Sequence, residues 1–187
     1  MPAQSFAIFD TAIGACGIVW TSRGVCGVQL PEGSDAATRA RVLRRHAGAV
    51  EAAPPPDVQR AIDGILTLLA GERADLSAIT IDDERTPSFN AKVYAIARTI
   101  PPGQTLTYGD IAKRLGDPLL ARDVGTALGQ NPTPLIVPCH RVLAAGGKTG
   151  GFSATGGVVT KLQLLSIENA QPGGPSLFAR LPLAVRR

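Results

Sequence analysis

The spacing of apolar positions in the first half of the chain predicts three strands followed by two helices. Two apolar runs flank the segment Thr21-Ser22-Arg23-Gly24, where Gly24 supplies the positive φ that a tight hairpin needs. Two later stretches carry apolar residues three and four positions apart, which is the helical period. The predicted strands cover residues 5–9, 14–20 and 25–30, and the predicted helices cover residues 34–46 and 58–69.

The pattern of the second half is mainly helical. A short helix, a turn at Gly116-Asp117-Pro118 and a second helix follow one another, which is typical of a helix-turn-helix. The apolar run 135–137 predicts a short buried strand, and Pro138 ends it because proline has no N–H to donate to a neighbouring strand. The predicted helices cover residues 88–99, 108–115, 119–128 and 158–169.

These elements together predict an α+β fold in two parts. The charged run 82–86, followed by Pro87, indicates a linker. It divides a small N-terminal domain, residues 1–86, with an antiparallel sheet, from a mainly helical domain, residues 87–170. The remaining residues, 171–187, are rich in proline and glycine, so we expect a loosely ordered tail.

The two parts differ in charge. Residues 1–86 contain 8 Lys and Arg against 11 Asp and Glu, whereas residues 87–187 contain 11 against 4, which gives the whole chain a net charge of +4. A basic half is the pattern expected of a protein with a polyanionic partner. A solvated basic surface gives the same count, so charge alone leaves both interpretations open.

The remaining composition argues against several classes of protein. No apolar run is long enough to span a bilayer, and the first ten residues lack the basic start of a signal peptide. Three cysteines make no disulfide framework, which indicates a reducing compartment, so we expect a cytoplasmic protein with no membrane partner. Cys16, Cys26 and His46 lack metal-ligand spacing, and we expect no metal site.

The strongest chemical signal is the pair Cys139-His140, directly after Pro138. A cysteine reacts as thiolate, and an unperturbed thiol is mostly protonated at neutral pH. A histidine can take that proton if a carboxylate holds its other ring nitrogen. Adjacent residues of an extended chain point to opposite sides, so we expect a bridging water between the two side chains. An isolated Cys-His pair is more often a core cysteine beside a capping histidine.

The residues around this pair carry a resemblance to a known family. The motifs are Asn131-Pro132, the run Leu135-Ile136-Val137-Pro138-Cys139-His140-Arg141-Val142, then Gly150-Gly151-Phe152-Ser153, Gly156-Gly157, and Glu168 near the end of the last predicted helix. They resemble the active-site segment of the alkylguanine-DNA alkyltransferases, also called methylated-DNA–protein-cysteine methyltransferases. The Pro-Cys-His-Arg core is highly specific to that family, and the resemblance covers residues 87–169.

The resemblance implies a fold and a set of site residues. The fold is an RNase H-like N-terminal domain and a C-terminal domain with a winged-helix-like helix-turn-helix. Alone, Tyr108 reads as a packing aromatic, and Arg122 and Glu168 as surface charges. By resemblance the catalytic residues are Cys139 (nucleophile), His140, Glu168 and Tyr108; the DNA-binding residues are Arg122, Tyr108, Ala121 and Gly125; the base-pocket residues are Val142, Phe152 and Ser153; and Asn131 is a structural hinge.

The same resemblance implies repair of 6-O-methylguanine, and with it the question of 4-O-methylthymine. The lesion oxygen lies inside the stacked duplex, so the nucleotide must be flipped out, and a planar cation can fill the gap. The implied partner is double-stranded DNA, bound through the minor groove by a monomer without a cofactor. The thioether product is chemically stable, so each molecule should act once, as a suicide enzyme.

Two departures from the family pattern bear on DNA binding. Asp123 stands next to Arg122, where alanine is more usual, and a carboxylate repels phosphate. Ala154-Thr155 is a two-residue insertion in the loop that lines the base pocket of relatives. Two other functions fit the same residues: a cysteine hydrolase with a Cys/His/Glu triad, or a non-catalytic helix-turn-helix protein that binds lesions or regulates transcription.

Overall fold

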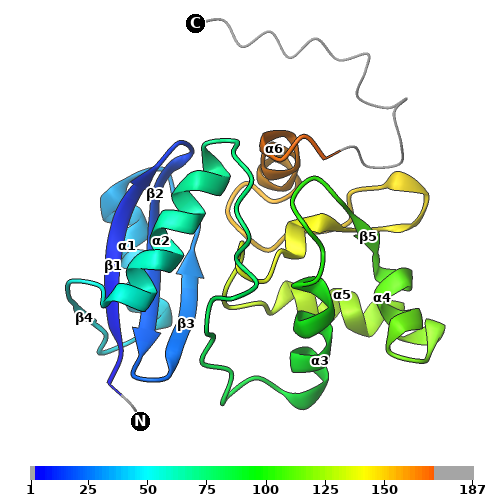
Figure 1. Ribbon diagram of the computed structural model, residues 1–187, viewed down its shortest axis with the longest axis horizontal. Coiled ribbons are helices and arrows are strands. Elements are labelled where there is room, and N and C mark those ends of the chain that lie inside the picture. The colour runs from blue at the N-terminus through cyan, green and yellow to red at the C-terminus, as the bar shows by residue number, and fades with distance from the viewer. Residues whose placement is uncertain (1–2, 171–187) are drawn as a thin grey trace, which may run out of the picture.

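The computed structural model describes residues 3–170, and the predicted tail, residues 171–187, lies outside the described residues. Figure 1 shows a sheet with its helices beside a group of shorter helices, with helix α6 (Val158–Ile167) lying between the two groups. The mixed α+β class predicted from the sequence is confirmed. No helix within the described residues is long and apolar enough to cross a membrane.

The N-terminal sheet contains four strands in the order β3-β2-β1-β4. Strands β1 (Ser5–Thr11), β2 (Gly14–Thr21) and β3 (Gly24–Gln29) form the predicted antiparallel hairpins. The two-residue strand β4 (Val50–Glu51) pairs with β1 in parallel, so the sheet is mixed at this edge. Parallel neighbours need a crossover connection, which here includes a helix, and the apolar pattern of the sequence did not show this crossover.

Helices cover both faces of this sheet, which agrees with the burial of β2 residues on both of its sides. Helix α1 (Asp35–Arg45) begins at Ser34, whose Oγ accepts a hydrogen bond from the Ala37 amide at 3.2 Å. It packs on the face that carries Phe6 and Val19. Helix α2 (Pro56–Leu69) packs on the opposite face, where Cys16, Ile18 and Trp20 alternate along β2.

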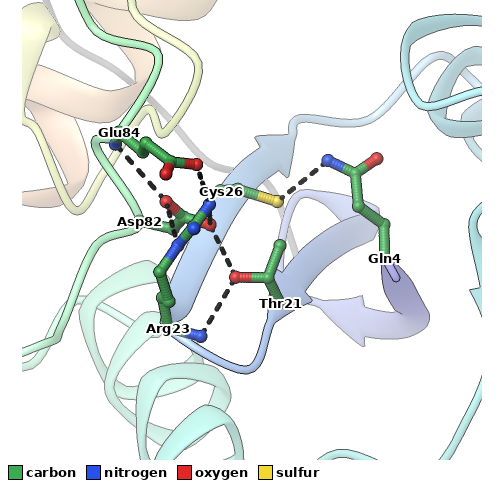
Figure 2. Close-up of polar contacts among 6 residues, drawn as sticks. All are labelled: Gln4, Thr21, Arg23, Cys26, Asp82 and Glu84. Atoms are coloured by element: carbon green, nitrogen blue, oxygen red, sulfur yellow. Dashed lines mark hydrogen bonds and ion pairs between the residues drawn. The ribbon is translucent and has the colours of Figure 1, made fainter. Parts of the chain in front are cut away.

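The linker between the two parts is fixed to the sheet. Residues 80–82 pair with β3 through two backbone hydrogen bonds, from Val25 N to the Thr80 carbonyl at 3.0 Å and from Asp82 N to the Val25 carbonyl at 2.9 Å. The Asp82 carboxylate accepts hydrogen bonds from Thr21 Oγ1 at 2.6 Å and from Arg23 Nε at 3.2 Å (Figure 2). Arg23 also pairs with Glu84. The acidic run is thus a clamp on the hairpin as well as a linker.

The helical part contains the predicted helix-turn-helix. The elements of this part are α3 (Ser88–Ala97), β5 (Leu106–Thr107), α4 (Tyr108–Arg114), η1 (Pro118–Leu120), α5 (Ala121–Gly129), η2 (Cys139–Arg141), β6 (Val142–Leu143) and η3 (Ala145–Gly147). Side-chain hydrogen bonds connect α3 to α5, since Tyr94 Oη donates to the Ala127 carbonyl at 2.8 Å and Asn90 Nδ2 donates to Gln130 Oε1 at 3.0 Å.

The prediction of a strand at residues 135–137 is wrong. This segment is a tight turn with a single bridge between Pro134 and Val137, and Leu135 has a left-handed φ of 74°. The run is apolar for a different reason, because Leu135 and Ile136 are buried in the same cluster as Trp20 and Ile65 of the N-terminal part. The loop before the cysteine is therefore anchored in the N-terminal core. The domain boundary near residue 86 stays a prediction.

The Asp82 clamp gives a prediction for stability. Asp82→Ala should lower the free energy of unfolding by about 1–3 kcal/mol, because hydrogen bonds to a charged carboxylate are lost. Its interactions with Thr21 and Arg23 outweigh the effect of burial and lower the pKa of Asp82, so the penalty should be present at neutral pH and fade in acid. Urea denaturation measures it. The exposed neighbour Asp83 is the control, and an equal loss in Asp83→Ala would contradict the clamp.

Candidate active site

A cleft of about 520 Å³ is lined by residues that lie far apart in the sequence, from Tyr108 to Ser153. Its walls come from α4, α5, the cysteine turn η2 and the loop after Gly150. Seven of the residues selected from the sequence line it: Tyr108, Ala121, Arg122, Gly125, Cys139, Phe152 and Ser153. The thiol and the exposed face of the helix-turn-helix therefore share one cavity.

Local capping interactions place Tyr108 at this cleft. Thr107 caps helix α4, with Asp110 N donating to Thr107 Oγ1 at 3.0 Å and Thr107 N donating to Asp110 Oδ2 at 2.9 Å. This capping box fixes Tyr108 as the first residue of the helix. The loop opposite approaches closely, because a Cβ at Gly150 would lie 2.7 Å from Tyr108 Oη. Gly150, with a φ of +69°, is thus needed there for two reasons.

Cys139 lies at the start of η2, directly after Pro138, and is 7% exposed. Its Sγ accepts a hydrogen bond from Asn131 Nδ2 at 3.3 Å. Asn131 Nδ2 also donates to the Val137 carbonyl at 2.8 Å, and Asn131 Oδ1 accepts from Thr133 N at 3.0 Å. Since Asn131 follows α5 closely, these hydrogen bonds connect the end of α5 to the cysteine turn, and the hinge role of Asn131 stays a prediction.

His140, next to the cysteine, is completely buried and points to the end of α6. Its Nε2 lies 2.8 Å from Glu168 Oε1. The same carboxylate accepts from Arg141 Nε at 2.9 Å and from Arg141 Nη2 at 2.8 Å, while Arg141 Nη1 donates to the Ile100 carbonyl at 2.6 Å. His140, Arg141 and Glu168 therefore form one buried cluster that joins η2, α6 and the segment after α3.

Burial and charge set the protonation states of this cluster. Although burial raises the pKa of Glu168, its hydrogen bonds with His140 and Arg141 dominate and lower it to about 2. Burial lowers the pKa of His140, so the imidazole is neutral at neutral pH. An ionised Glu168 only accepts, which puts the proton of His140 on Nε2 and leaves Nδ1 as the basic atom. Nδ1 has no hydrogen-bond partner within residues 3–170.

The resting thiol is protonated. Burial raises the pKa of Cys139, and the hydrogen bond from Asn131 and the charge of Lys161 oppose only part of this effect. Burial also raises the pKa of Tyr108, which keeps its hydroxyl a proton donor. The site thus holds a neutral thiol, a neutral imidazole and an ionised carboxylate. In this state the thiol is an acid and Nδ1 of the imidazole is a free base.

Two residues of this site were missed by the sequence reasoning. Arg141 was visible only as a letter of the Pro-Cys-His-Arg motif, yet it makes a bidentate pair with Glu168. Lys161 is completely buried and donates from Nζ to the Val142 carbonyl at 2.6 Å. The available signal was its spacing, because Lys161 falls on the same helix face as the buried residues Leu164 and Leu165.

The remaining predicted residues do not line this cleft. Val142 is fully buried in the same hydrophobic cluster as Cys139, and its carbonyl accepts a hydrogen bond from Lys161. The inserted residues Ala154 and Thr155 line a second, much smaller cavity of about 30 Å³ that Cys139 also borders. No group of three or more His, Cys, Asp and Glu side chains within the described range is arranged to hold a metal ion.

The fold and the site define a class of protein in which a helix-turn-helix adjoins a buried cysteine. Residues 88–170 match the family described as "6-O-methylguanine DNA methyltransferase, DNA binding domain". The chain is 32% identical over 158 residues to the methylated-DNA–protein-cysteine methyltransferase of Methanothermobacter thermautotrophicus, covering 84% of this chain and 81% of that protein. It is 40% identical over 119 residues to that of Mycobacterium tuberculosis, covering 63% and 70%.

Solved structures agree with these relatives. The crystal structure of Mycobacterium tuberculosis OGT in complex with DNA superposes with a TM-score of 0.72 at 30% identity, covering 88% of this chain and 92% of that one. The chain belongs to the family of methylated-DNA–protein-cysteine methyltransferases.

The low pKa of Glu168 predicts a pH dependence of stability. Between pH 4.5, its ordinary pKa, and about pH 2, the unfolded chain takes up a proton that the folded protein refuses. The free energy of unfolding should therefore fall by roughly 3 kcal/mol across this window. In Glu168→Gln this acid-dependent part should vanish, with lower stability at neutral pH because Arg141 is left buried and unpaired.

Denaturant unfolding at a series of pH values measures both effects. Glu72 is the matched control, because it is an exposed glutamate of the same chain. Glu72→Gln should keep the wild-type slope. A wild-type slope in Glu168→Gln would show that the acid loss comes from other carboxylates.

Proposed function

We propose that Cys139 is the residue that accepts the alkyl group. As a member of its family, the chain is a DNA repair enzyme that transfers an alkyl group from methylated DNA to a cysteine of the protein. Cys139 lines the cleft beside the helix-turn-helix. Cys16 is completely buried among core residues, which raises its pKa to about 12, and burial raises the pKa of Cys26 to about 11. The position of Cys139 carries the proposal.

In the proposed reaction, the thiol proton of Cys139 passes through a bridging water to Nδ1 of His140. Glu168 holds the opposite N–H and stabilises the imidazolium that forms. The sulfur then attacks the alkyl carbon, so that a carbon–sulfur bond forms as the bond between that carbon and the guanine oxygen breaks. Tyr108 gives a proton or a hydrogen bond to the departing guanine. The thioether has no leaving group that the site could expel, which supports a single turnover.

We propose that 6-O-methylguanine in duplex DNA is the substrate, approached through the minor groove. Arg122 is exposed at the first turn of α5 and lines the same cleft as Cys139 and Tyr108. A flipped nucleotide could thus enter the cleft while the guanidinium fills the gap in the stack. The small residues Ala121 and Gly125 allow the backbone of α5 to come close to DNA. 4-O-methylthymine is the second candidate substrate for the same cleft.

The flipped base would be held by the walls of the cleft. Phe152 offers an aromatic face for stacking, and the backbone N–H of Ser153 is assigned to the guanine oxygen. The backbone carbonyls of Cys139 and Val142 are assigned to the exocyclic amine. Lys161 already donates to the Val142 carbonyl, but a carbonyl has two lone pairs and can accept a second bond.

We further propose two domain types, a monomeric state and a cytoplasmic location for this protein. The sheet with helices on both faces is consistent with an RNase H-like domain, and α4 and α5 with a winged-helix-like domain. The protein should act as a monomer, because one chain supplies every residue of the proposed site. A reactive thiol needs a reducing compartment, which favours the cytoplasm.

Transfer to Cys139 is tested with a methylated duplex oligonucleotide. One molar equivalent of protein should remove one equivalent of lesion and gain one methyl group on the peptide that contains Cys139, as mass spectrometry would show. The peptides of Cys16 and Cys26 are internal controls and should stay unmodified. Cys139→Ala should abolish removal while remaining folded by circular dichroism.

Each alternative gives a different result in this assay. A cysteine hydrolase would release product in many turnovers, and a non-catalytic lesion binder would leave the lesion intact. Removal of the lesion by folded Cys139→Ala would overturn the proposal.

The neighbours Arg122 and Asp123 should have opposite effects on activity. Both are exposed at the start of α5. Arg122→Ala should slow single-turnover transfer from duplex about tenfold or more, because nothing then compensates for base extrusion, while transfer from the free base should change little. Asp123→Ala should increase affinity for duplex DNA, most clearly at low salt, since a carboxylate facing phosphate is removed. Arg114→Ala on exposed α4 is the control, and equal effects at all three positions would contradict the assignment.

A further inference from the structure

Lys161 is a buried cation without a carboxylate partner in residues 3–170. Its side chain is 0% exposed. Nζ donates to the Val142 carbonyl at 2.6 Å and to the Gly151 carbonyl at 3.3 Å, and lies 5.7 Å from the centre of the Tyr108 ring. Within the described residues it takes part in no ion pair. Burying an ammonium is costly unless an opposite charge compensates it, so this position calls for a functional reason.

The charged and titratable groups around the cleft leave one candidate partner. Glu168 is already neutralised by the bidentate guanidinium of Arg141, and it also holds His140. The groups that face the thiol from the packed elements are Tyr94 on α3, Tyr108 on α4, Arg122 on α5, His140 and Arg141 on η2, Lys161 on α6, Glu168 at its end, and Glu32, Arg41 and Arg45 across the small cavity. Within this set, Cys139 is the group that becomes an anion at the start of the proposed reaction, before Tyr108 gives a proton or a hydrogen bond to the departing guanine.

We infer that the ammonium of Lys161 is the counter-charge of the Cys139 thiolate. The inference rests on the proposed role of Cys139 as the nucleophile. The two carbonyls hold the ammonium rigidly between Val142 and Gly151, on the two segments that enclose the cleft, so its charge is in place before the proton leaves the sulfur. Lys161 is a positioning residue, because it acts on the thiol by charge and does not touch the alkyl group.

The charge bookkeeping explains why a lysine suits this position. When His140 takes the thiol proton, a thiolate forms beside Lys161 and the two charges compensate each other. When the thiolate becomes a neutral thioether, that compensation is lost. Burial lowers the pKa of Lys161 to about 8, and the charge of Cys139 raises it again, so the two groups titrate as a coupled pair.

The test measures the pKa of each thiol in the free, full-length protein. Alkylation by iodoacetamide is followed across a pH series, and mass spectrometry quantifies each cysteine peptide separately. In Lys161→Gln, which keeps amide donors for both carbonyls but removes the charge, the midpoint for Cys139 should lie about one pH unit higher or more. Lys161→Arg should keep the midpoint near the wild-type value. Cys26 serves as the internal reference and should not change.

An unchanged Cys139 midpoint in folded Lys161→Gln would overturn the inference and leave Lys161 as a support for the two carbonyls. If that variant does not fold, the wild-type protein gives the answer. The Lys161 ε-methylene is titrated by NMR before and after Cys139 is blocked with iodoacetamide. The pKa of Lys161 should be lower in the blocked protein, and an equal pKa in both forms would also overturn the inference.

This experiment contains no DNA, so it separates the inference from the proposed function. A higher thiol midpoint in Lys161→Gln, together with no methyl transfer from DNA in wild-type protein, would support the counter-charge and refute the function. Methyl transfer with an unmoved thiol midpoint would do the reverse. Where both hold, the pH profile of single-turnover transfer in Lys161→Gln should move to higher pH and approach the wild-type rate in alkaline solution.

Discussion

The buried carboxylate of Glu168 is the interaction on which the site depends. Its carboxylate, at the end of α6, is hydrogen-bonded to His140 Nε2 and accepts from Nε and Nη2 of Arg141, and the Gly103 amide also donates to it at 3.3 Å. This one carboxylate therefore connects the turn that carries Cys139 to the segment after α3. It also determines the tautomer of the imidazole. A buried charge is tolerated here because every partner is present, and removal of one would leave the others uncompensated.

The N-terminal part supports the candidate site by packing, and none of its side chains has a role in the proposed reaction. Leu135 and Ile136 pack among its core residues, so the cysteine turn is held from behind by the sheet and α2. Leu164 of α6 belongs to the same cluster. One hydrophobic core thus holds both the cysteine turn and the helix that ends at Glu168. This coupling gives Cys139 and Glu168 fixed positions relative to each other.

Much of the fold could be predicted because its helices and hairpins obey local rules. Ser34 and Thr107 cap helices, and Gly24 has the positive φ of a hairpin turn, so the residue types themselves indicate these positions. The turn at Leu135 could not be predicted, because burial by a distant core and burial within a strand give the same apolar run. Lys161 and the pairing of Arg141 with Glu168 depend on contacts between distant segments, and only the spacing of Lys161 gave a local hint. The other candidate residues came from the family motifs, and the structure brings seven of them to one cleft, a grouping that composition and spacing do not indicate.

The way the linker covers β3 has a consequence for how the chain can be divided. Strand β3 lies at an edge of the sheet, and residues 80–82 occupy part of its free hydrogen-bonding side. A fragment that stopped before residue 79 would expose this backbone and invite pairing with other copies, which leads to aggregation. An expression fragment of the N-terminal part should therefore retain the chain through Asp82, whose carboxylate closes the hairpin from outside.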